Sequence, residues 1–355
     1  MKIYYYVSGH GFGHISRTSE ILKKLLLQDF IEEIWVVSPR SEFLDFTHHK
    51  LKLRSETLDV GVIQKDSLSI DLTSTKQKLI SFEKEKNNLI KTESAFIKDK
   101  KLSIVLTDSG SLPISIAMEA NIPSIFIGNF TWDFIYRNYK SSDVYFGEIA
   151  DLIEVEYGFA TEALTLPFQC PMPSFLEINQ IGLVGRKPTK SKKECRKQFG
   201  FLDNVQYILL SFGAYGLEGT NLKTDQLQSN IQLVAHGVPG LENKDILSPN
   251  VDHYPNLVAA ADFVCTKPGY GILSECYYAQ TPILYTDRGD FSEYPYLVSA
   301  LEKYFIASYM DRSEIIACAF ERVISAMKQY DQMTNRSQVL LDGETDVVNH
   351  LLEYI

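Results

Sequence analysis

Apolar runs alternate with amphipathic segments along the first half of the chain. Short runs rich in β-branched and aromatic residues occupy residues 3–7, 33–38, 103–107 and 123–127. Residues 15–27 and 112–120 instead place their apolar side chains at helical spacing. Strands that alternate with helices are typical of a parallel sheet, so the pattern predicts an α/β fold.

The same pattern begins again in the second half of the chain. Further strands are predicted at residues 206–211, 232–235, 261–265 and 281–285. Before them, residues 185–193 form a lysine-rich stretch with a proline, which is typical of a linker. We therefore predict two domains, 1–185 and 186–355, each large enough for a core of its own. The sequence leaves open whether the last predicted helix, 339–354, packs back on the first domain.

Composition and charge narrow the class of protein. The chain has 355 residues and a net charge of −10, which disfavours nucleic acid or an anionic membrane as a partner held by overall electrostatics. No run approaches the ~18 apolar residues of a membrane helix, so we expect any membrane contact to be peripheral. The five cysteines lack metal-ligand spacing and predict reduced thiols, which favours the cytoplasm. Interspersed lysines and glutamates at residues 75–101 indicate a solvated helix rather than a basic binding arm.

A glycine-rich turn carries the first candidate chemistry. Gly9, Gly11 and Gly13 leave backbone amides uncovered near the start of the first predicted helix, where an anionic or polar ligand is favoured. A dinucleotide-binding loop looks similar, but this loop adds the imidazoles of His10 and His14. Because imidazole accepts a proton near neutral pH, His14 is a candidate general base. The alternative is that His14 only packs beside the helix start, while His10 shapes the loop.

A second glycine-bearing loop follows the predicted strand at residues 261–265. Lys267 is positioned to pair with a diphosphate, and the amides near Tyr270 and Gly271 to donate hydrogen bonds to it. Glu275, one turn into the next helix, is a candidate acceptor of hydrogen bonds from ribose hydroxyls. Loops at the carboxyl edge of a parallel sheet are where such folds bind ligands. The alternative is a structural turn with a surface lysine. The same motif adds two further candidate donor contacts, Gly269 and Ser274.

Other loops of the second predicted domain complete the candidate donor site. Asp290 and Glu293 follow the strand at 281–285 and are candidates for binding sugar hydroxyls, although Glu293 is equally a candidate cap of the next helix. The remaining candidate donor contacts are Arg288 and Phe291 in the same loop, Gly213 and Ala214 after the strand at 206–211, Val251 in the loop 250–254 that we expect beside the base, and Gly13 in the first glycine-rich turn.

The candidate acceptor side lies in the first predicted domain. Trp132 follows a predicted strand and is a candidate aromatic face for a sugar or lipid acceptor, with core packing as the alternative. Asp133 is a candidate contact for an acceptor hydroxyl, and Asp108 is a candidate for orienting His14. The loop residues His10 and Phe12 complete this predicted side.

These motifs resemble those of the two-domain GT-B glycosyltransferases, including the bacterial peptidoglycan N-acetylglucosaminyltransferase and the plant UDP-glycosyltransferases. The resemblance covers most of the chain and implies two Rossmann-like domains whose parallel sheets face each other across a cleft. It implies that His14 activates the acceptor, that Glu275 binds the ribose and that Asp290 contacts the donor sugar. Lys267 stands where those families carry a phosphate-binding histidine, and Phe291 where the plant enzymes carry a glutamine.

A more specific resemblance is to the N-terminal glycosyltransferase-like region of plant L-arabinokinase. It rests on four blocks, at residues 8–14, 129–136, 170–175 and 267–271. We find no second phosphate loop of kinase character, and therefore do not expect sugar-kinase activity.

From these residues we expect inverting transfer of a sugar from a nucleotide-diphosphate donor, most readily a UDP-sugar, to a hydroxyl acceptor. His14 takes the acceptor's proton, while Lys267 and helix-end amides stabilise the leaving diphosphate. No DxD-type motif is placed for a metal, so neither a metal nor a further cofactor is expected. Two alternatives stay open: a non-catalytic nucleotide-sugar sensor of the same fold, and a nucleotide-sugar 2-epimerase, which is less favoured because it needs more acid–base groups.

Overall fold

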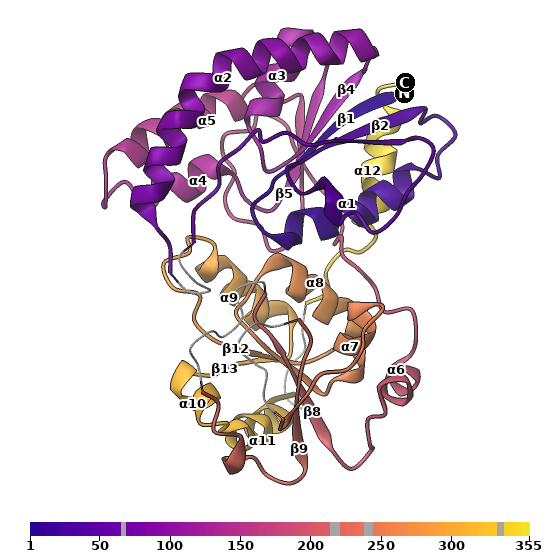
Figure 1. The fold of residues 1–355 in the computed structure, drawn as a ribbon, viewed down its shortest axis with the longest axis vertical. Coiled ribbons are helices and arrows are strands. Elements are labelled where there is room, and N and C mark those ends of the chain that lie inside the picture. Colours follow the sequence, from indigo (N-terminus) through magenta and orange to yellow (C-terminus); the bar gives the residue numbers. More distant parts are fainter. Residues whose placement is uncertain (65–68, 214–220, 238–243, 332–336) are drawn as a thin grey trace. The chain divides into compact units, whose positions relative to one another are not determined.

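The chain folds into two compact units, each built around its own parallel sheet (Figure 1). The structure is a computed structural model that describes residues 1–64, 69–213, 221–237, 244–331 and 337–355. Unit 1 consists of Met1–Ile63, Ile70–Val184 and Val339–Ile355, and unit 2 is formed mainly by Gly185–Gln338. The α/β class predicted from the alternating strands and helices is therefore confirmed.

Unit 1 contains a sheet of seven parallel strands in the order β3-β2-β1-β4-β5-β6-β7. The strands are β1 (Lys2–Val7), β2 (Glu33–Val37), β3 (Leu51–Arg54), β4 (Ile104–Asp108), β5 (Ser124–Gly128), β6 (Glu162–Thr165) and β7 (Ile178–Gln180). The helices are α1 (Phe12–Leu25), α2 (Leu72–Lys100), α3 (Leu112–Ala120), α4 (Trp132–Arg137), α5 (Tyr145–Tyr157) and α12 (Gly343–Leu352).

The central strand β1 is buried on both faces, which explains its continuous apolar run. Ile3 and Tyr5 belong to one hydrophobic core, shared with α1 and α12, whereas Tyr4 and Tyr6 belong to a second core, shared with α2 and α3. A parallel strand covered by helices on both faces does not show the alternation of a half-exposed strand. Four of the seven lysines of helix α2 are exposed, as its composition predicts, whereas Glu93 is buried.

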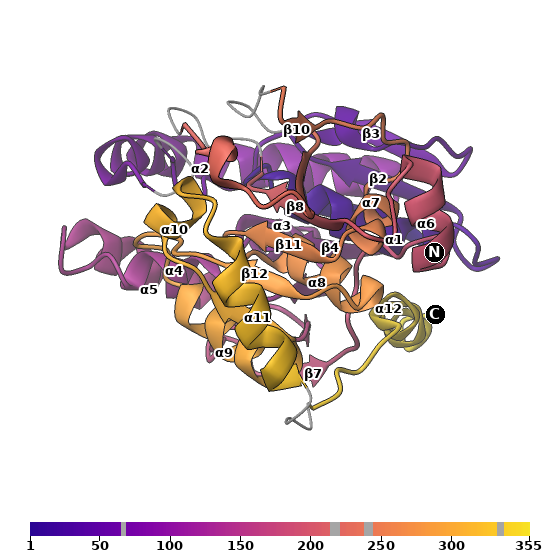
Figure 2. The same cartoon turned by 90° about the horizontal axis from the view of Figure 1, so that it is seen from below.

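Unit 2 contains six parallel strands in the order β10-β9-β8-β11-β12-β13. The strands are β8 (Gln206–Ser211), β9 (Ile231–Ala235), β10 (Ile246–Leu247), β11 (Phe263–Thr266), β12 (Ile283–Tyr285) and β13 (Ala307–Tyr309). The helices are α6 (Lys192–Phe199), α7 (Tyr254–Ala260), α8 (Tyr270–Ala279), α9 (Tyr294–Tyr304), α10 (Arg312–Ile316) and α11 (Phe320–Asp331). Residues of α10 and α11 share a core with β8, β11 and β12, and Figure 2 shows β8, β11 and β12 following one another in the sheet.

The structure adds elements that the sequence pattern does not indicate. The strands β3, β6, β7, β10 and β13 have two to four residues each, too few to produce a recognisable period. The first helix begins at Phe12, not near Ile15, and α8 begins at Tyr270, not near Ile272, because glycine-rich loops continue directly into helical backbone. Within the described part of the chain, no helix combines the length and apolar character needed to cross a bilayer.

The chain returns to unit 1 at its C-terminal end, so the second predicted domain, 186–355, ends in the structure at Gln338. Helix α12 packs beside α1 (Figure 1), where Val347 and Leu351 complete the core. At the start of α12 the backbone of Gly343 lies very close to that of Gly182. A β-carbon at position 343 would lie 1.9 Å from the Gly182 carbonyl oxygen. Asp346 accepts a hydrogen bond from the Gly182 amide at 2.8 Å. A glycine at position 343 is therefore required by space.

We expect Gly343→Ala to destabilise unit 1 by about 3 kcal/mol, because the added methyl group overlaps backbone and cannot be relieved by a side-chain rotation. The thermal midpoint of unfolding, followed by circular dichroism, measures this loss. Gly13→Ala is the matched control, since its backbone is helical and, among the described residues beyond its own turn of helix, a β-carbon on Gly13 has no neighbour within 4 Å. Equal midpoints for the two variants would show that the α12 connection relaxes freely.

Candidate functional site

In unit 1 the carboxyl ends of three neighbouring strands bring the candidate residues of the first predicted domain together. Strand β4 lies between β1 and β5, all parallel, so the segments that follow these strands meet at one edge of the sheet. The glycine-rich loop follows β1, Asp108 ends β4, and Asn129 follows β5 directly. This edge is the usual ligand-binding side of a parallel sheet.

The glycine-rich loop holds His14 in the first turn of α1. Gly11 is the residue before the helix and has φ +86°, a value that L side chains rarely adopt. Because the residue before the helix is a glycine, it has no side chain to cap the helix start, where an anionic or polar ligand is favoured. The Arg40 Nε donates to the Gly9 carbonyl oxygen at 2.7 Å and anchors the loop to the segment that follows β2. The side chain of Phe12 lies outside what the structure describes.

His14 and Asp108 form a direct contact at this edge. The His14 Nδ1 lies 2.7 Å from Asp108 Oδ1, and both side chains are buried. Burial by itself raises the pKa of Asp108, but the positive charge of Arg17 and the interaction with His14 outweigh it and lower the pKa to about 2. An ionised carboxylate only accepts hydrogen bonds, so the His14 Nδ1 carries the hydrogen of this contact.

Arg17 completes the set of donors around Asp108. Its Nη2 donates to Oδ1 at 2.6 Å and its Nε to Oδ2 at 3.2 Å, while Nη1 donates to the Asn129 side-chain oxygen. Thr18 donates to Oδ2 at 3.1 Å and Ser109 to Oδ1 at 3.2 Å. Both carboxylate oxygens are thus engaged by several donors, which fixes the orientation of Asp108.

Trp132 lies inside unit 1 and does not offer the open aromatic face that we expected for an acceptor. Its side chain is only 3 % exposed, and its Nε1 donates to Asp59 Oδ2 at 3.1 Å. The His10 ring meets it edge to face at 5.2 Å, and Phe130 lies between it and His14, at 5.1 and 5.9 Å respectively. Trp132 therefore supports the loop residue His10. Its position corresponds to the alternative that we considered for it, packing in the core.

Asp59 and Asp133 are two further buried carboxylates of unit 1. Asp59 also accepts from the Tyr6 hydroxyl at 2.8 Å, and burial raises its pKa. Asp133 accepts from the Ser174 hydroxyl at 2.7 Å, whereas its Oδ1 has no hydrogen-bond partner among the described residues. Because Asp133 is buried, a contact with an acceptor hydroxyl is closed off in this arrangement.

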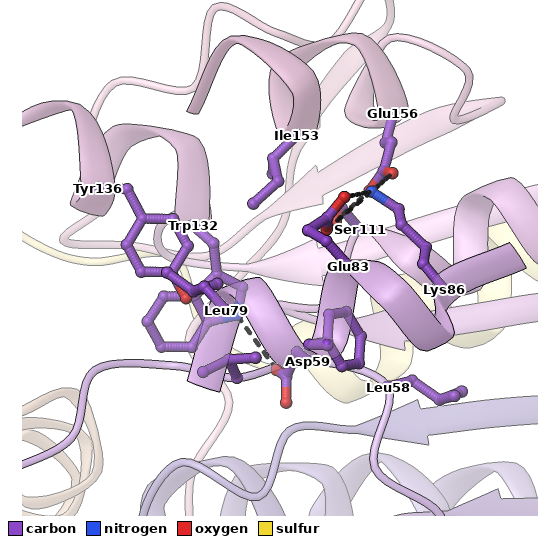
Figure 3. A pocket seen from close by; sticks show the side chains of 12 residues that line it. Leu58, Asp59, Leu79, Glu83, Lys86, Ser111, Trp132, Tyr136, Ile153 and Glu156 are labelled. Atoms are coloured by element: carbon purple, nitrogen blue, oxygen red, sulfur yellow. Dashed lines mark hydrogen bonds and ion pairs between the residues drawn. The ribbon is translucent and has the colours of Figure 1, made fainter. Parts of the chain in front are cut away.

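Behind Trp132 lies a small pocket, shown in Figure 3. Apolar side chains form one part of its wall, and Lys86 closes another part through ion pairs with Glu83, at 3.2 Å, and with Glu156. Ser111 donates to Glu156 at 2.6 Å. The pocket leaves a volume of about 20 Å³ for the centres of water molecules. This volume holds one or two waters and is too small for a sugar. The pocket therefore serves the packing of unit 1.

In unit 2 the candidate donor loops also share one sheet edge. Strand β11 lies between β8 and β12, and the loop after it runs directly into α8. The Thr266 hydroxyl donates to the Ser211 carbonyl oxygen at 2.5 Å, and the Thr286 amide donates to the Thr266 carbonyl oxygen at 3.1 Å. Lys267 and Gly269 lie in the middle of these linked loops, and Gly269, which has no side chain to serve as a cap, is the residue before α8. Gly213 is exposed with φ +71°, and Ala214 lies outside the described residues.

The helix α8 holds two of the expected donor contacts in intramolecular bonds. Glu275 is buried, and its Oε1 accepts from Arg186 Nε at 2.7 Å and also from Arg186 Nη2. The Ser274 hydroxyl is turned inward and donates to the Gly271 carbonyl oxygen at 2.8 Å. A ribose hydroxyl that binds Glu275 therefore has to compete with the Arg186 guanidinium. Arg186 is not among the site residues predicted from the sequence.

The loop after β12 carries unused donors. Arg288 pairs with Glu293 at 3.0 Å and lies over the Phe291 ring at 4.8 Å, yet its buried Nε and Nη1 have no partner among the described residues. Glu293 precedes α9 but makes no capping hydrogen bond with its side chain. Asp290 is exposed, and Val251 is half-buried beside the segment that leads into α7. Buried guanidinium donors without partners are uncommon and indicate a polar ligand or bound water.

Comparisons with known proteins give the fold a name. The chain matches no family model. It is similar to the glycotransferase of kitacinnamycin, with a TM-score of 0.65, 13 % identity and coverage of 100 % of this chain and 99 % of the other. UGT2 from Phytolacca americana gives a TM-score of 0.61 at 11 % identity, with 99 % of each chain covered, and MurG from Acinetobacter baumannii gives 0.59 at 11 %, also with 99 % of each covered. The chain has the GT-B fold.

One curated protein shares more of the sequence. L-arabinokinase from Arabidopsis thaliana is 30 % identical over 351 residues, which cover 94 % of this GT-B chain. The match takes in 33 % of L-arabinokinase, so the chain spans about a third of the length of that relative. The predicted resemblance to GT-B glycosyltransferases is therefore confirmed for the fold. The predicted resemblance to L-arabinokinase is confirmed by the sequence identity.

Sequence reasoning missed several residues that surround the candidates of this GT-B chain. Arg17 sits three residues after His14 on the same helix face, a spacing that signals contact. Asp59 lies in an aperiodic region that gives no signal, and Arg186 lies in the predicted linker. Among the described residues, no group of three or more histidine, cysteine, aspartate or glutamate side chains is arranged to hold a metal ion.

Proposed function

We propose that the chain is a glycosyltransferase that moves a sugar from a nucleotide-diphosphate donor to a hydroxyl acceptor, with inversion and without a metal ion. The observation that carries the proposal is the buried contact between His14 and Asp108 at a glycine-rich helix start. An imidazole whose Nδ1 is held by a carboxylate presents its other nitrogen as a general base. The GT-B fold, which is shared with named glycosyltransferases, makes sugar transfer the reaction class to test.

The proposed reaction is a direct displacement. The His14 Nε2 takes the proton of the acceptor hydroxyl as the oxygen attacks the anomeric carbon, and the bond from that carbon to the diphosphate breaks. Negative charge then grows on the leaving diphosphate. In unit 2, Lys267 and the amides at the start of α8 are the groups suited to stabilise that charge. Attack opposite the leaving group inverts the anomeric centre.

The donor that we propose is a UDP-sugar. A solved relative of the same fold, UGT2 from Phytolacca americana, is in complex with UDP-2fluoro-glucose and pterostilbene. In this chain the unused Arg288 donors and the exposed Asp290 carboxylate are suited to sugar hydroxyls, which both accept and donate hydrogen bonds. The acceptor is a hydroxyl compound that a transfer assay with a mixed acceptor panel has to identify.

A nucleotide-sugar-binding role without turnover is the second candidate. The similarity to one third of a protein named for kinase activity favours it, because a region within a larger protein can serve regulation. A donor that stabilises the chain yet is neither hydrolysed nor transferred would support this role over catalysis.

Donor binding is tested by thermal shift against a panel of nucleotide sugars and by one variant. A true donor at 100 times its dissociation constant is expected to stabilise the chain by about 2.7 kcal/mol. Lys267→Ala is expected to weaken the affinity roughly 10- to 100-fold, since a hydrogen bond to a charged group contributes about 1.5–3 kcal/mol. Lys193→Ala, at an exposed lysine of α6, is the matched control. Equal donor affinity for the two variants would remove Lys267 from the donor site.

A further inference from the structure

We propose that Arg17 is a positioning residue that keeps the His14 imidazole unprotonated, and therefore able to act as a base, near neutral pH. The inference rests on the proposed function, because it explains how the same site stays competent. It assigns to α1 a third member of the His14–Asp108 arrangement.

The geometry shows that Arg17 acts on His14 through Asp108. Arg17 lies three positions after His14 in α1, so the two side chains share one face of the helix, and both contact Asp108 at the end of β4. Asp108 Oδ1 receives the His14 Nδ1 at 2.7 Å and the Arg17 Nη2 at 2.6 Å, while Oδ2 receives the Arg17 Nε. The side chains of Arg17 and Asp108 are 9 % and 1 % exposed, so water screens this interaction poorly. A guanidinium held in this way cannot swing away from the carboxylate.

The charge balance explains why the third residue matters. A buried carboxylate in contact with an imidazole favours the protonated ring, and a protonated ring cannot accept the acceptor's proton. The guanidinium of Arg17 is always charged, so it neutralises Asp108 and repels a second positive charge on the ring. With Arg17 present, the carboxylate orients His14 without holding it as an imidazolium.

The other groups that face His14 do not replace Arg17. Ser109 approaches the ring Nδ1 at 3.5 Å from the end of β4, and Phe130 meets the ring from the segment after β5. Asp59 is the second carboxylate whose charge acts on the ring, and it accepts hydrogen bonds from Tyr6 and Trp132, which are neutral. Among the described contacts of this arrangement, Arg17 is the cation that offsets a carboxylate charge.

A purely structural role would be different in a measurable way. If Arg17 only held Asp108 in place, its loss would lower the rate equally at every pH. If it also sets the charge, its loss moves the acidic limb of the pH profile of kcat/KM to higher pH, and raising the pH restores the rate. The charge and the hydrogen bonds can be separated because glutamine keeps donors near Asp108, whereas lysine keeps the charge.

The experiment compares Arg17→Gln with Arg17→Lys, after circular dichroism shows that each is folded. The His14 ring signal is followed by NMR between pH 5 and 9 and is identified by its absence in His14→Asn. In Arg17→Gln the midpoint of the ring titration is expected to move up by about one pH unit, and kcat/KM at acidic pH to fall about tenfold with recovery at pH 9. Arg17→Lys is expected to stay closer to the wild type.

Three results would overturn the inference. One is an unmoved midpoint in Arg17→Gln, and another is equal movement in both variants. The third result needs no variant: it is the observation that the His14 ring of the wild-type protein is still protonated above pH 8. The NMR titration does not depend on turnover, so a protein that shows no transfer activity would defeat the proposed function while still allowing the role of Arg17 to be decided.

Discussion

Replacing His14 by asparagine is expected to lower kcat for sugar transfer by about 10²- to 10⁴-fold while leaving donor affinity nearly unchanged. The reason is that general-base catalysis contributes a factor of this size, and the asparagine amide cannot take a proton from the acceptor hydroxyl. Asparagine is close to histidine in size near the backbone and offers its side-chain amide to Asp108, so the α1 start keeps its local contacts. Transfer rates with a verified donor and acceptor, together with donor thermal shifts, measure the two effects separately.

The matched control for this variant is His10→Asn. Both histidines belong to the same glycine-rich loop, but the His10 ring packs edge to face on Trp132, whereas the His14 ring contacts Asp108. We therefore expect His10→Asn to change kcat less than His14→Asn and to affect KM for the acceptor instead. A His14→Asn variant with an undiminished transfer rate would eliminate His14 as the base, whatever the control shows.

Replacing Asp108 by asparagine is expected to damage both activity and stability. An amide can present its NH₂ group to the His14 Nδ1 and so stabilise the wrong tautomer, an effect that lowers kcat by about 10⁴ in enzymes with a histidine–carboxylate pair. The same change leaves the buried Arg17 guanidinium without its carboxylate, which costs about 3–5 kcal/mol. Denaturant unfolding and transfer kinetics report the two losses independently.

The pH dependence of stability gives this second prediction a sharp signature. The folded-state pKa of Asp108 is about 2, below the ordinary value of 3.8, so the ionised carboxylate stabilises the folded chain above about pH 4. The contribution, about 2 kcal/mol, is lost as the pH falls from 4 towards 2, because the unfolded chain then binds the proton more readily. Asp108→Asn should lack this acid-dependent loss. Asp59→Asn is the control, since Asp59 accepts from Tyr6 and Trp132 and pairs with no arginine among the residues that the structure describes.

The two largest expected effects have one origin in the structure. Asp108 ends the strand that lies between β1 and β5, and its carboxylate meets side chains that α1 delivers from the N-terminal end of the chain. Removing the base changes the chemistry alone, whereas removing the carboxylate also leaves a buried charge unpaired. For this reason we expect the stability of His14→Asn to stay near that of the wild type.

The sequence by itself determined the long buried strands and the loops between them. Strands such as β1, β4, β8 and β11 are continuous apolar runs, because both faces of a parallel sheet are covered, and such runs are visible without any partner. The glycine-rich turns after β1 and β11 are equally local, since they depend on backbone freedom and on the helix that follows. Short strands such as β7 and β13 carry too few residues for a period and were missed.

The tertiary structure alone decided which charged and aromatic side chains are buried in the folded protein. A helical arginine such as Arg17 normally indicates solvent, yet it is buried because Asp108, 91 positions later, and Asn129, 112 positions later, accept its hydrogen bonds. Trp132 was expected as an open face and is closed by Asp59, which lies 73 positions earlier. Glu275 was expected at a ribose and is held by Arg186. Each of these outcomes depends on a partner that is distant along the chain, whereas the pattern of apolar residues depends only on near neighbours.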